Sequence, residues 1–281
     1  MKLGKLFTPV SSMSPEEVRA FRDAHEEGSY TLLDVRQPHE YEDSHIPGAI
    51  LIPLPDLLDT LDNLDPEKPT IVYCAIGGRS RVAAQLLSGK GFTEPINLSG
   101  GIKAWDGLKA AGPVELNLDL VRADSSLGDV LKVAYGMEHA LAEFYRLMQS
   151  RSEHGPVADL LGRLASVEEK HKQYLREVYE AISPVHVDTQ SLETAASTME
   201  GGFRIEDFVR ENEQFTKASS TLLDLAMMLE TQALDLYLRF ADKMEAEKSR
   251  QVLFTIGNEE KGHLRALGRL RDEVSSHEPR D

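Results

Sequence analysis

Apolar and polar positions follow two different periods along this chain. Up to about residue 113, short β-branched runs typical of buried strands alternate with short helical segments, and Pro and Gly separate them. A capping-box sequence, Ser14-Pro15-Glu16-Glu17, starts the first helix. Strands are expected at 30–35, 49–52, 70–73 and 96–98, with further helical segments near 56–63, 80–90 and 101–110. This order predicts an α/β domain over residues 1–113, a parallel sheet with helices on both faces.

From about residue 125 the apolar positions recur with the helical period instead. Four long helices are predicted at 126–151, 157–183, 218–244 and 248–274, with turns at His154-Gly155-Pro156, Ser183-Pro184 and 245–248. The stretch 184–217 is too long for a hairpin loop, so it crosses the bundle and carries a short helix around 205–212. We therefore expect a linker at 114–124 and an all-α four-helix bundle over residues 125–281.

Net charge and composition exclude several classes of partner and site. The 31 Lys and Arg residues against 47 Asp and Glu leave a charge of −16, which repels nucleic acid and anionic membrane surfaces. No apolar run reaches the roughly 20 residues of a membrane span, and no secretory segment opens the chain, so a cytoplasmic location is expected. The single cysteine, Cys74, excludes an internal disulfide and any paired-cysteine zinc, rubredoxin or iron–sulfur site.

Cys74 lies between a buried strand and a helix, in a turn that contains Gly77 and Gly78. Such a turn directs several backbone N–H groups at one point, and the helix dipole, Arg79 and Arg81 add positive charge. These groups favour a thiolate, and a thiolate at the carboxyl end of a parallel strand is a candidate nucleophile. The alternative is a buried, inert cysteine, and the adjacent Gly77-Gly78-Arg79 favours the reactive interpretation.

Several motifs in order make residues 10–112 resemble a single-domain rhodanese sulfurtransferase. They are Leu33-Asp34-Val35-Arg36, Glu40-Tyr41, His45-Ile46-Pro47-Gly48-Ala49, Cys74-x-x-Gly77-x-Arg79-Ser80 and Gly100-Gly101-Ile102-x-Ala104-Trp105.

The resemblance implies that Cys74 accepts sulfane sulfur as a persulfide from thiosulfate or another persulfide and passes it to a thiol. Arg79 and the loop would bind the sulfonate or the persulfide, through Ala75, Ile76, Gly77, Gly78 and Ser80. Four residues separate Cys74 from Arg79, one fewer than in the related phosphatase-type loop, so the loop suits sulfur better than a phosphoryl group. Asp34 and Arg36 are interpreted as polar groups that brace the loop.

The helical half repeats itself at an offset of 92 residues. Glu138, Tyr145, Glu168 and His171 recur as Glu230, Tyr237, Glu260 and His263. If the two glutamates of each copy lie level on antiparallel helices, the turns must fall at their midpoints, residues 153 and 245. Both midpoints coincide with predicted turns, so the bundle is interpreted as two copies of one helical hairpin.

Six of these residues have the pattern of a di-metal site. One glutamate on each of two helices and Glu-x-x-His on each of the others is the di-iron or di-manganese carboxylate arrangement. Carboxylate and imidazole ligands suit iron or manganese. The alternative is ordinary surface ion pairs, but six matching residues at one offset, Glu138, Glu168, His171, Glu230, Glu260 and His263, favour two bound metal ions.

Residues 125–275 accordingly resemble the ferritin-like superfamily and its rubrerythrin group. The resemblance implies a di-iron centre that reacts with peroxide or dioxygen, and a homodimer. The chain departs from the rubrerythrin pattern in two ways. Rubrerythrins have an extra glutamate three residues after the ligand that corresponds to Glu230, and Ala233 stands there in this chain. The chain also lacks the cysteines of a rubredoxin domain. Electrons must then come from an external donor protein or from a sulfur species.

The sequence thus predicts a sulfurtransferase fused to a di-iron domain that reacts with peroxide or dioxygen. Two other functions stay open. One is a peroxide or oxygen reductase whose rhodanese half only docks a persulfidated partner. The other is a non-enzymatic sensor in which Cys74 and the metals report redox or sulfur state.

Overall fold

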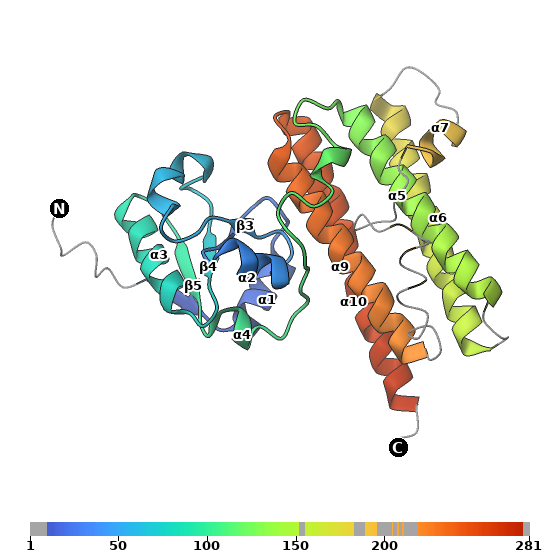
Figure 1. The fold of residues 1–281 in the computed structure, drawn as a ribbon, viewed down its shortest axis with the longest axis horizontal. Coiled ribbons are helices and arrows are strands. Elements are labelled where there is room, and N and C mark those ends of the chain that lie inside the picture. Colours follow the sequence, from blue (N-terminus) through green and yellow to red (C-terminus); the bar gives the residue numbers. More distant parts are fainter. Residues whose placement is uncertain are drawn as a thin grey trace. The chain divides into compact units, whose positions relative to one another are not determined.

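The structure is a computed structural model that describes residues 10–151, 155–182, 189–195, 204, 207, 210 and 219–277 (Figure 1). The chain divides into two compact units, Met1–Leu116 and Asn117–Asp281. The division falls inside the segment 114–124 that the sequence marks as a linker.

In the first unit the described residues form a five-stranded sheet in the order β1-β5-β4-β2-β3. Its strands are β1 (Ser11–Met13), β2 (Thr31–Asp34), β3 (Ile50–Leu51), β4 (Thr70–Tyr73) and β5 (Pro95–Leu98). All neighbouring strands are parallel, as predicted. The edge strand β1 was not predicted, because Ser-Ser-Met is too short and too polar to give a strand pattern.

The helices of this unit are α1 (Pro15–Ala24), α2 (Pro38–Asp43), α3 (Gly78–Gly89) and α4 (Gly101–Ala104). The capping box before α1 is confirmed, since Ser14 Oγ accepts a hydrogen bond from the backbone N–H of Glu17 and the Glu17 carboxylate accepts one from that of Ser14. The helix predicted near 56–63 is instead two 3₁₀ turns, Leu57–Asp59 and Leu61–Asn63. The sequence pattern did not predict α2, and α4 ends earlier than predicted because the backbone is extended at Trp105.

Successive residues of the central strands point into different cores on the two faces of the sheet. Leu32 and Ile71 pack with Val18 of α1 and Ile102 of α4 in one core. The next residues along the same strands pack with α3 in the other core, which contains Leu33, Val72, Ala83, Ala84 and Leu87. Helices therefore cover both faces, as the alternation of elements predicted.

The second unit contains four long helices, α5 (Leu127–Arg151), α6 (Pro156–Ile182), α9 (Ser219–Lys243) and α10 (Glu247–His277), and the short α7 (Thr189–Glu193). Their limits lie within three residues of the predicted ones. Helix α5 packs on α6, and α9 packs on α10, so the two helices of each predicted hairpin pack against each other. The Ser183-Pro184 turn, His154 and most of the predicted helix at 205–212 lie outside the described residues.

The bundle has two apolar cores, and equivalent positions of the 92-residue repeat lie in opposite ones. Ala134 and Leu175 belong to the first core, whereas their counterparts Ala226 and Leu267 belong to the second. Tyr145 likewise belongs to the second core, and its counterpart Tyr237 belongs to the first. This exchange is the arrangement expected of two hairpins related by an approximate two-fold axis, and it leaves the six predicted ligands between the two cores.

Part of the expected linker packs on the bundle. Val121 is buried in the first core, and the Lys243 ammonium donates hydrogen bonds to the carbonyl oxygens of Leu118 and Val121. These contacts fix the chain where it enters α5.

The contact between α4 and the Cys74 turn yields a prediction. Gly101 has φ +59°, and a Cβ atom there would lie 2.2 Å from the carbonyl oxygen of Cys74. Gly101→Ala should therefore lower the free energy of unfolding by more than about 2 kcal/mol, measured by urea unfolding. Gly89→Ala in α3 is the control, since its added methyl group meets no atom within 4 Å and should change stability little. Equal stability of the two variants would contradict this account of the turn.

Candidate active-site loop and metal centre

The sulfur of Cys74 lies at the end of β4 inside the turn that leads into α3. Cys74 is 1% exposed, and its Sγ accepts a hydrogen bond from the backbone N–H of Gly77 at 3.2 Å and contacts the hydroxyl of Ser80 at 3.5 Å. Gly77 adopts φ +91°, where a side chain would lie 3.1 Å from the backbone nitrogen of Gly100. The glycine therefore allows the close turn that directs the N–H group at the sulfur.

Hydrogen bonds to the sulfur outweigh its burial. Burial disfavours the thiolate, but the Ser80 hydroxyl and the backbone N–H groups of Ser80, Ile76 and Gly77 lower the pKa of Cys74 below that of an ordinary thiol. The fold from β4 to α3 thus favours an anionic sulfur at this position.

Arg79, predicted to bind the sulfonate, is held at the loop by an ion pair with α2. Its guanidinium donates two hydrogen bonds of 2.7 Å to the carboxylate of Glu40. These bonds lower the pKa of Glu40 to about 2, although burial acts in the opposite direction. The charge of Arg79 also interacts with Cys74. In the sequence, Glu40 stands in a motif but nothing in its local pattern indicates this pairing with Arg79.

Asp34 and Arg36 form a buried brace beside the loop. Arg36 donates to both carboxylate oxygens of Asp34 and to the carbonyl oxygen of Ser44, and its guanidinium lies over the ring of Tyr73. Asp34 is fully buried. These contacts support the structural role expected for both residues.

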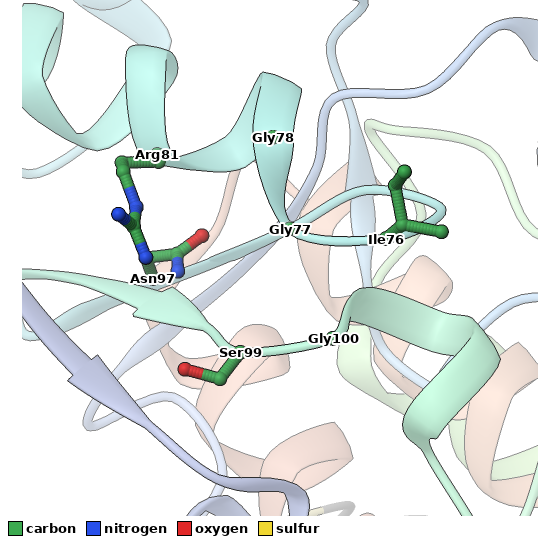
Figure 2. A pocket seen from close by; sticks show the side chains of 7 residues that line it. All are labelled: Ile76, Gly77, Gly78, Arg81, Asn97, Ser99 and Gly100. Carbon is green, nitrogen blue, oxygen red and sulfur yellow. The ribbon is translucent and has the colours of Figure 1, made fainter.

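A cavity of about 330 Å³ opens beside the loop (Figure 2). Its lining residues come from the loop, from α3 and from the end of β5, and they are Ile76, Gly77, Gly78, Arg81, Asn97, Ser99 and Gly100. Arg81 is exposed and, among the described residues, makes no ion pair. Sequence analysis missed Asn97, which reaches the loop from a different strand.

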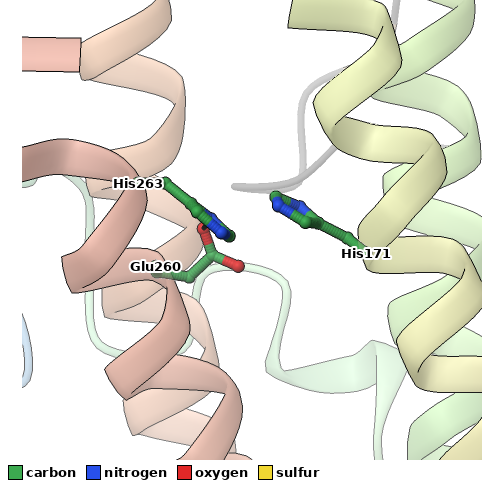
Figure 3. A group of neighbouring side chains, drawn as sticks. All are labelled: His171, Glu260 and His263. Atoms are coloured by element: carbon green, nitrogen blue, oxygen red, sulfur yellow. Dashed lines mark hydrogen bonds and ion pairs between the residues drawn. The ribbon is translucent and has the colours of Figure 1, made fainter. Parts of the chain in front are cut away.

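The predicted metal ligands meet in the middle of the bundle. All four glutamates are at most 1% exposed. His171 Nδ1 lies 2.9 Å from Oε2 of Glu168 and 3.2 Å from Oε2 of Glu138. His263 Nδ1 lies 3.2 Å from Oε2 of Glu260. The two imidazole rings stack with centroids 3.8 Å apart, and Figure 3 shows them facing one another from α6 and α10.

Five of the six residues fall into two overlapping groups whose ligand atoms lie within 4.8 Å of one another. One group is Glu138, Glu168 and His171, and the other is His171, Glu260 and His263. The sixth residue, Glu230, is buried on α9. Burial lowers the pKa of His171, but the ion pair with Glu168 and the charges of Glu260 and Glu230 outweigh it and raise that pKa to about 9.

This arrangement fits a pair of metal ions. Burying several carboxylates together is unfavourable without cations, and two histidines lie beside them in the described part of the bundle. Among the described residues, neither buried oxygen of Glu168 accepts a hydrogen bond of good geometry. Carboxylate oxygens and imidazole nitrogens are ligands that suit iron or manganese.

Two known protein families match this chain, one in each of its halves. The rubrerythrin family model matches residues 129–271, just over half of the sequence. The chain therefore belongs to the rubrerythrin family. The rhodanese-like domain model matches residues 17–108, so a rhodanese-like domain is fused to the rubrerythrin domain. The rubrerythrin domain implies a di-iron centre.

Individual relatives match the rhodanese-like domain. The uncharacterized protein YqhL of Bacillus subtilis is 41% identical over 99 residues, which cover 35% of this chain and 74% of YqhL. The thiosulfate sulfurtransferase GlpE of Pseudomonas syringae is 34% identical over 98 residues, covering 35% of this chain and 89% of GlpE. A crystal structure of a rhodanese-like domain protein from Staphylococcus aureus is 28% identical, with a TM-score of 0.32, and covers 34% of this chain and 91% of that one. No helix in the described part of this chain is long and apolar enough to cross a membrane.

The hydrogen bonds at Cys74 generate a prediction about its reactivity. Because its pKa is lowered, the rate of alkylation by iodoacetamide should reach half its maximum at a pH below the value of about 8.5 for a free thiol. Ser80→Ala should raise this midpoint. Cys74 is the only thiol, so the same protein unfolded in denaturant is a direct control. A folded-state midpoint at or above that of the unfolded chain would contradict the prediction.

Proposed function

We propose that the rhodanese-like domain is a sulfurtransferase that carries sulfane sulfur as a persulfide on Cys74. The observation that carries this proposal is the anion-stabilising turn around the only thiol of the chain. The name of the relative GlpE, a thiosulfate sulfurtransferase, supports the same chemistry.

The reaction has two displacements at sulfur. The Cys74 thiolate attacks the outer sulfur of thiosulfate, the S–S bond of thiosulfate breaks, and sulfite leaves with the bonding electron pair. An acceptor thiolate then attacks the outer sulfur of the Cys74 persulfide, and Cys74 leaves as a thiolate. The sulfur stays at the same oxidation level in both steps, so no separate oxidant or reductant is required.

The loop residues bind and orient the anions in this scheme. The N–H groups from Ala75 to Ser80 stabilise charge on sulfur, and Arg79 binds the sulfonate oxygens. Arg79 shares its charge with Glu40 in the free protein, so it is held at the rim of the loop before the substrate arrives. Four loop residues between Cys74 and Arg79 form a small cradle, which suits a sulfur group.

In the rubrerythrin domain, six residues would hold two irons, or two manganese ions: Glu138, Glu168, His171, Glu230, Glu260 and His263. When bound, the irons would supply redox chemistry with peroxide or dioxygen. The buried carboxylates would neutralise the charge of the metal ions, and the two apolar cores would exclude bulk water on either side of the ligands. The missing rubredoxin cysteines leave electron supply to an external protein or a sulfur species.

One observation favours a second candidate function, in which the rhodanese half docks a persulfidated partner for a peroxide or oxygen reductase. Ile76 is 67% exposed on the Cys74 loop and offers a protein partner an apolar contact. A thiosulfate-to-cyanide assay beside a peroxide-consumption assay on the iron-loaded protein separates the two. Peroxide consumption without sulfur transfer would favour docking.

Substitution of Arg79 tests its role in sulfur transfer. Arg79→Ala should raise the KM for thiosulfate about tenfold or more, the size of a lost charge-assisted hydrogen bond. The melting temperature should change little, because the Arg79–Glu40 pair is about a third exposed on the arginine side. Because Arg79→Ala leaves Glu40 unpaired, the double variant with Glu40→Gln isolates the lost cation.

Two further variants serve as controls for the measurement on Arg79→Ala, one expected to be inactive and one expected to match the parent. Cys74→Ser should abolish transfer while it leaves the fold and metal content intact. Lys90→Ala removes an exposed cation at the other end of α3, and it should match the parent. Retained transfer in Cys74→Ser would refute the sulfurtransferase, and equal KM values in Arg79→Ala and Lys90→Ala would refute the role of Arg79.

Metal loading tests the second domain. Protein loaded with ferrous iron should bind two irons per chain, and Glu168→Ala or Glu260→Ala should lower that number, measured by elemental analysis. Bound metal should stabilise the helical unit by about 2.7 kcal/mol at a hundredfold excess over Kd and leave the α/β unit nearly unchanged. Glu143→Ala is the control, because Glu143 lies on the same helix as Glu138 but is half exposed and pairs with Arg146. Equal iron loss in Glu143→Ala and Glu168→Ala would refute the di-metal site.

A further inference from the structure

Asn97 lines the cavity beside the Cys74 loop (Figure 2), and its side-chain amide lies between the hydroxyl groups of Ser80 and Ser12. Asn97 belongs to β5, the neighbour of β4, and is 1% exposed. Its Oδ1 accepts a hydrogen bond from Ser80 at 2.7 Å, and its Nδ2 donates one to Ser12 at 3.3 Å. The same Ser80 oxygen lies 3.5 Å from the sulfur of Cys74. One line of polar groups therefore connects Ser12 with Cys74.

Ser80 has a single hydroxyl hydrogen and two acceptors within reach. The contact with Asn97 is the shorter, so we assign the hydroxyl hydrogen to that side when Oδ1 faces Ser80. This direction suits a protonated Cys74, whose S–H can donate to the Ser80 oxygen. A thiolate cannot donate, and it is stabilised only if Ser80 turns its hydrogen toward the sulfur. The two protonation states of Cys74 thus require opposite directions of one hydroxyl.

The surroundings of Asn97 permit both directions. A half-turn of its side chain exchanges Oδ1 and Nδ2, after which Nδ2 donates to Ser80 and Ser80 donates to the sulfur. Ser12 then donates to Oδ1. Because both neighbours are hydroxyls, which donate or accept, every polar group in the line keeps a partner in either orientation. Neither an aspartate nor an apolar side chain at position 97 has this property.

We propose that Asn97 is a positioning residue whose amide orientation follows the charge on Cys74 and, through Ser80, supplies a hydrogen bond to the anionic sulfur. The inference rests on the proposed function, since it concerns how the nucleophile of sulfur transfer is kept anionic. No proton passes along the line. The thiol proton leaves to water, and the hydrogen bonds between Ser12, Asn97, Ser80 and Cys74 reverse their direction.

Other charged and titratable groups lie on the elements next to the Cys74 loop, and the test leaves them unchanged. They are Arg79 and Arg81 on α3, Glu40 on α2, and the Asp34, Arg36 and Tyr73 group at the ends of β2 and β4.

The test measures the pH midpoint of Cys74 alkylation by iodoacetamide in the full chain. Asn97→Asp replaces the amide with a group that only accepts, so the Ser80 hydrogen stays away from the sulfur. We expect the midpoint to rise by about one to two pH units, the effect of losing a hydrogen bond to a charged group. Ser99→Asp is the matched control. It places the same charge in the same cavity, and no hydrogen bond joins the Ser99 and Ser80 side chains in the described structure.

The two variants separate hydrogen bonding from charge. Asn97→Asp should raise the midpoint more than Ser99→Asp does, and the difference should vanish when Ser80→Ala is added to both. Equal shifts in the two variants, or a difference that survives Ser80→Ala, would overturn the proposal. Alkylation needs no sulfur transfer, so an inactive parent that still shows the difference would refute the sulfurtransferase and leave Asn97 in its role.

A second measurement uses the parent protein and does not depend on whether Asn97→Asp folds. The NMR signals of the Asn97 side-chain amide should titrate with the same midpoint as Cys74 alkylation, because the amide turns when the sulfur ionises. In Ser80→Ala they should no longer follow that midpoint. Signals that stay constant through the titration of the parent would overturn the proposal.

Discussion

Burying negative charge away from water is unfavourable unless positive or hydrogen-bonding groups compensate it, and both sites of this protein depend on that constraint. In the rhodanese-like domain the tight turn around Cys74 favours a thiolate, whose charge the backbone N–H groups would compensate. In the rubrerythrin domain the charge is a group of buried carboxylates, and two imidazoles lie beside them in the described part of the bundle. The first site is complete within the fold, whereas the second calls for metal ions.

The parallel sheet explains why the first site needs no metal. Strand β4 ends at Tyr73, and a short turn that begins with Cys74 leads into α3 at Gly78, so amide groups and the helix N-terminus point at the sulfur. Helix α4 contacts the turn, because the backbone N–H of Ile102 donates a hydrogen bond of 2.8 Å to the carbonyl oxygen of Cys74. Gly101 allows this approach because no side chain fits between the two segments. The loop conformation therefore depends on packing as well as on its own glycines.

In the bundle, two copies of one helical hairpin supply the candidate metal ligands. Two hairpins related by an approximate two-fold axis bring Glu138 and Glu168 together with their counterparts between the two apolar cores. The symmetry does not extend to the outer surfaces. Glu143 is half exposed and pairs with Arg146, whereas its counterpart Asp235 is fully buried and pairs with Arg239 at 2.7 Å. The correspondence between the two hairpins thus holds at the candidate ligands and at the core positions named above, and it fails at this pair.

The sequence by itself determined most of the elements and most of the candidate site residues, because these depend on local patterns. Periodicity located the long helices within three residues, the Cys74 turn follows from its glycines, and the offset of 92 residues identified six candidate ligands. Only the tertiary structure decided the pairing of Glu40 with Arg79 and the placement of Asn97 behind Ser80. These partners are 39 and 17 residues apart, and they meet because the strand order β1-β5-β4-β2-β3 brings their elements together. A hydrogen bond requires a separation of about 3 Å, and that separation depends on packing that no local pattern records.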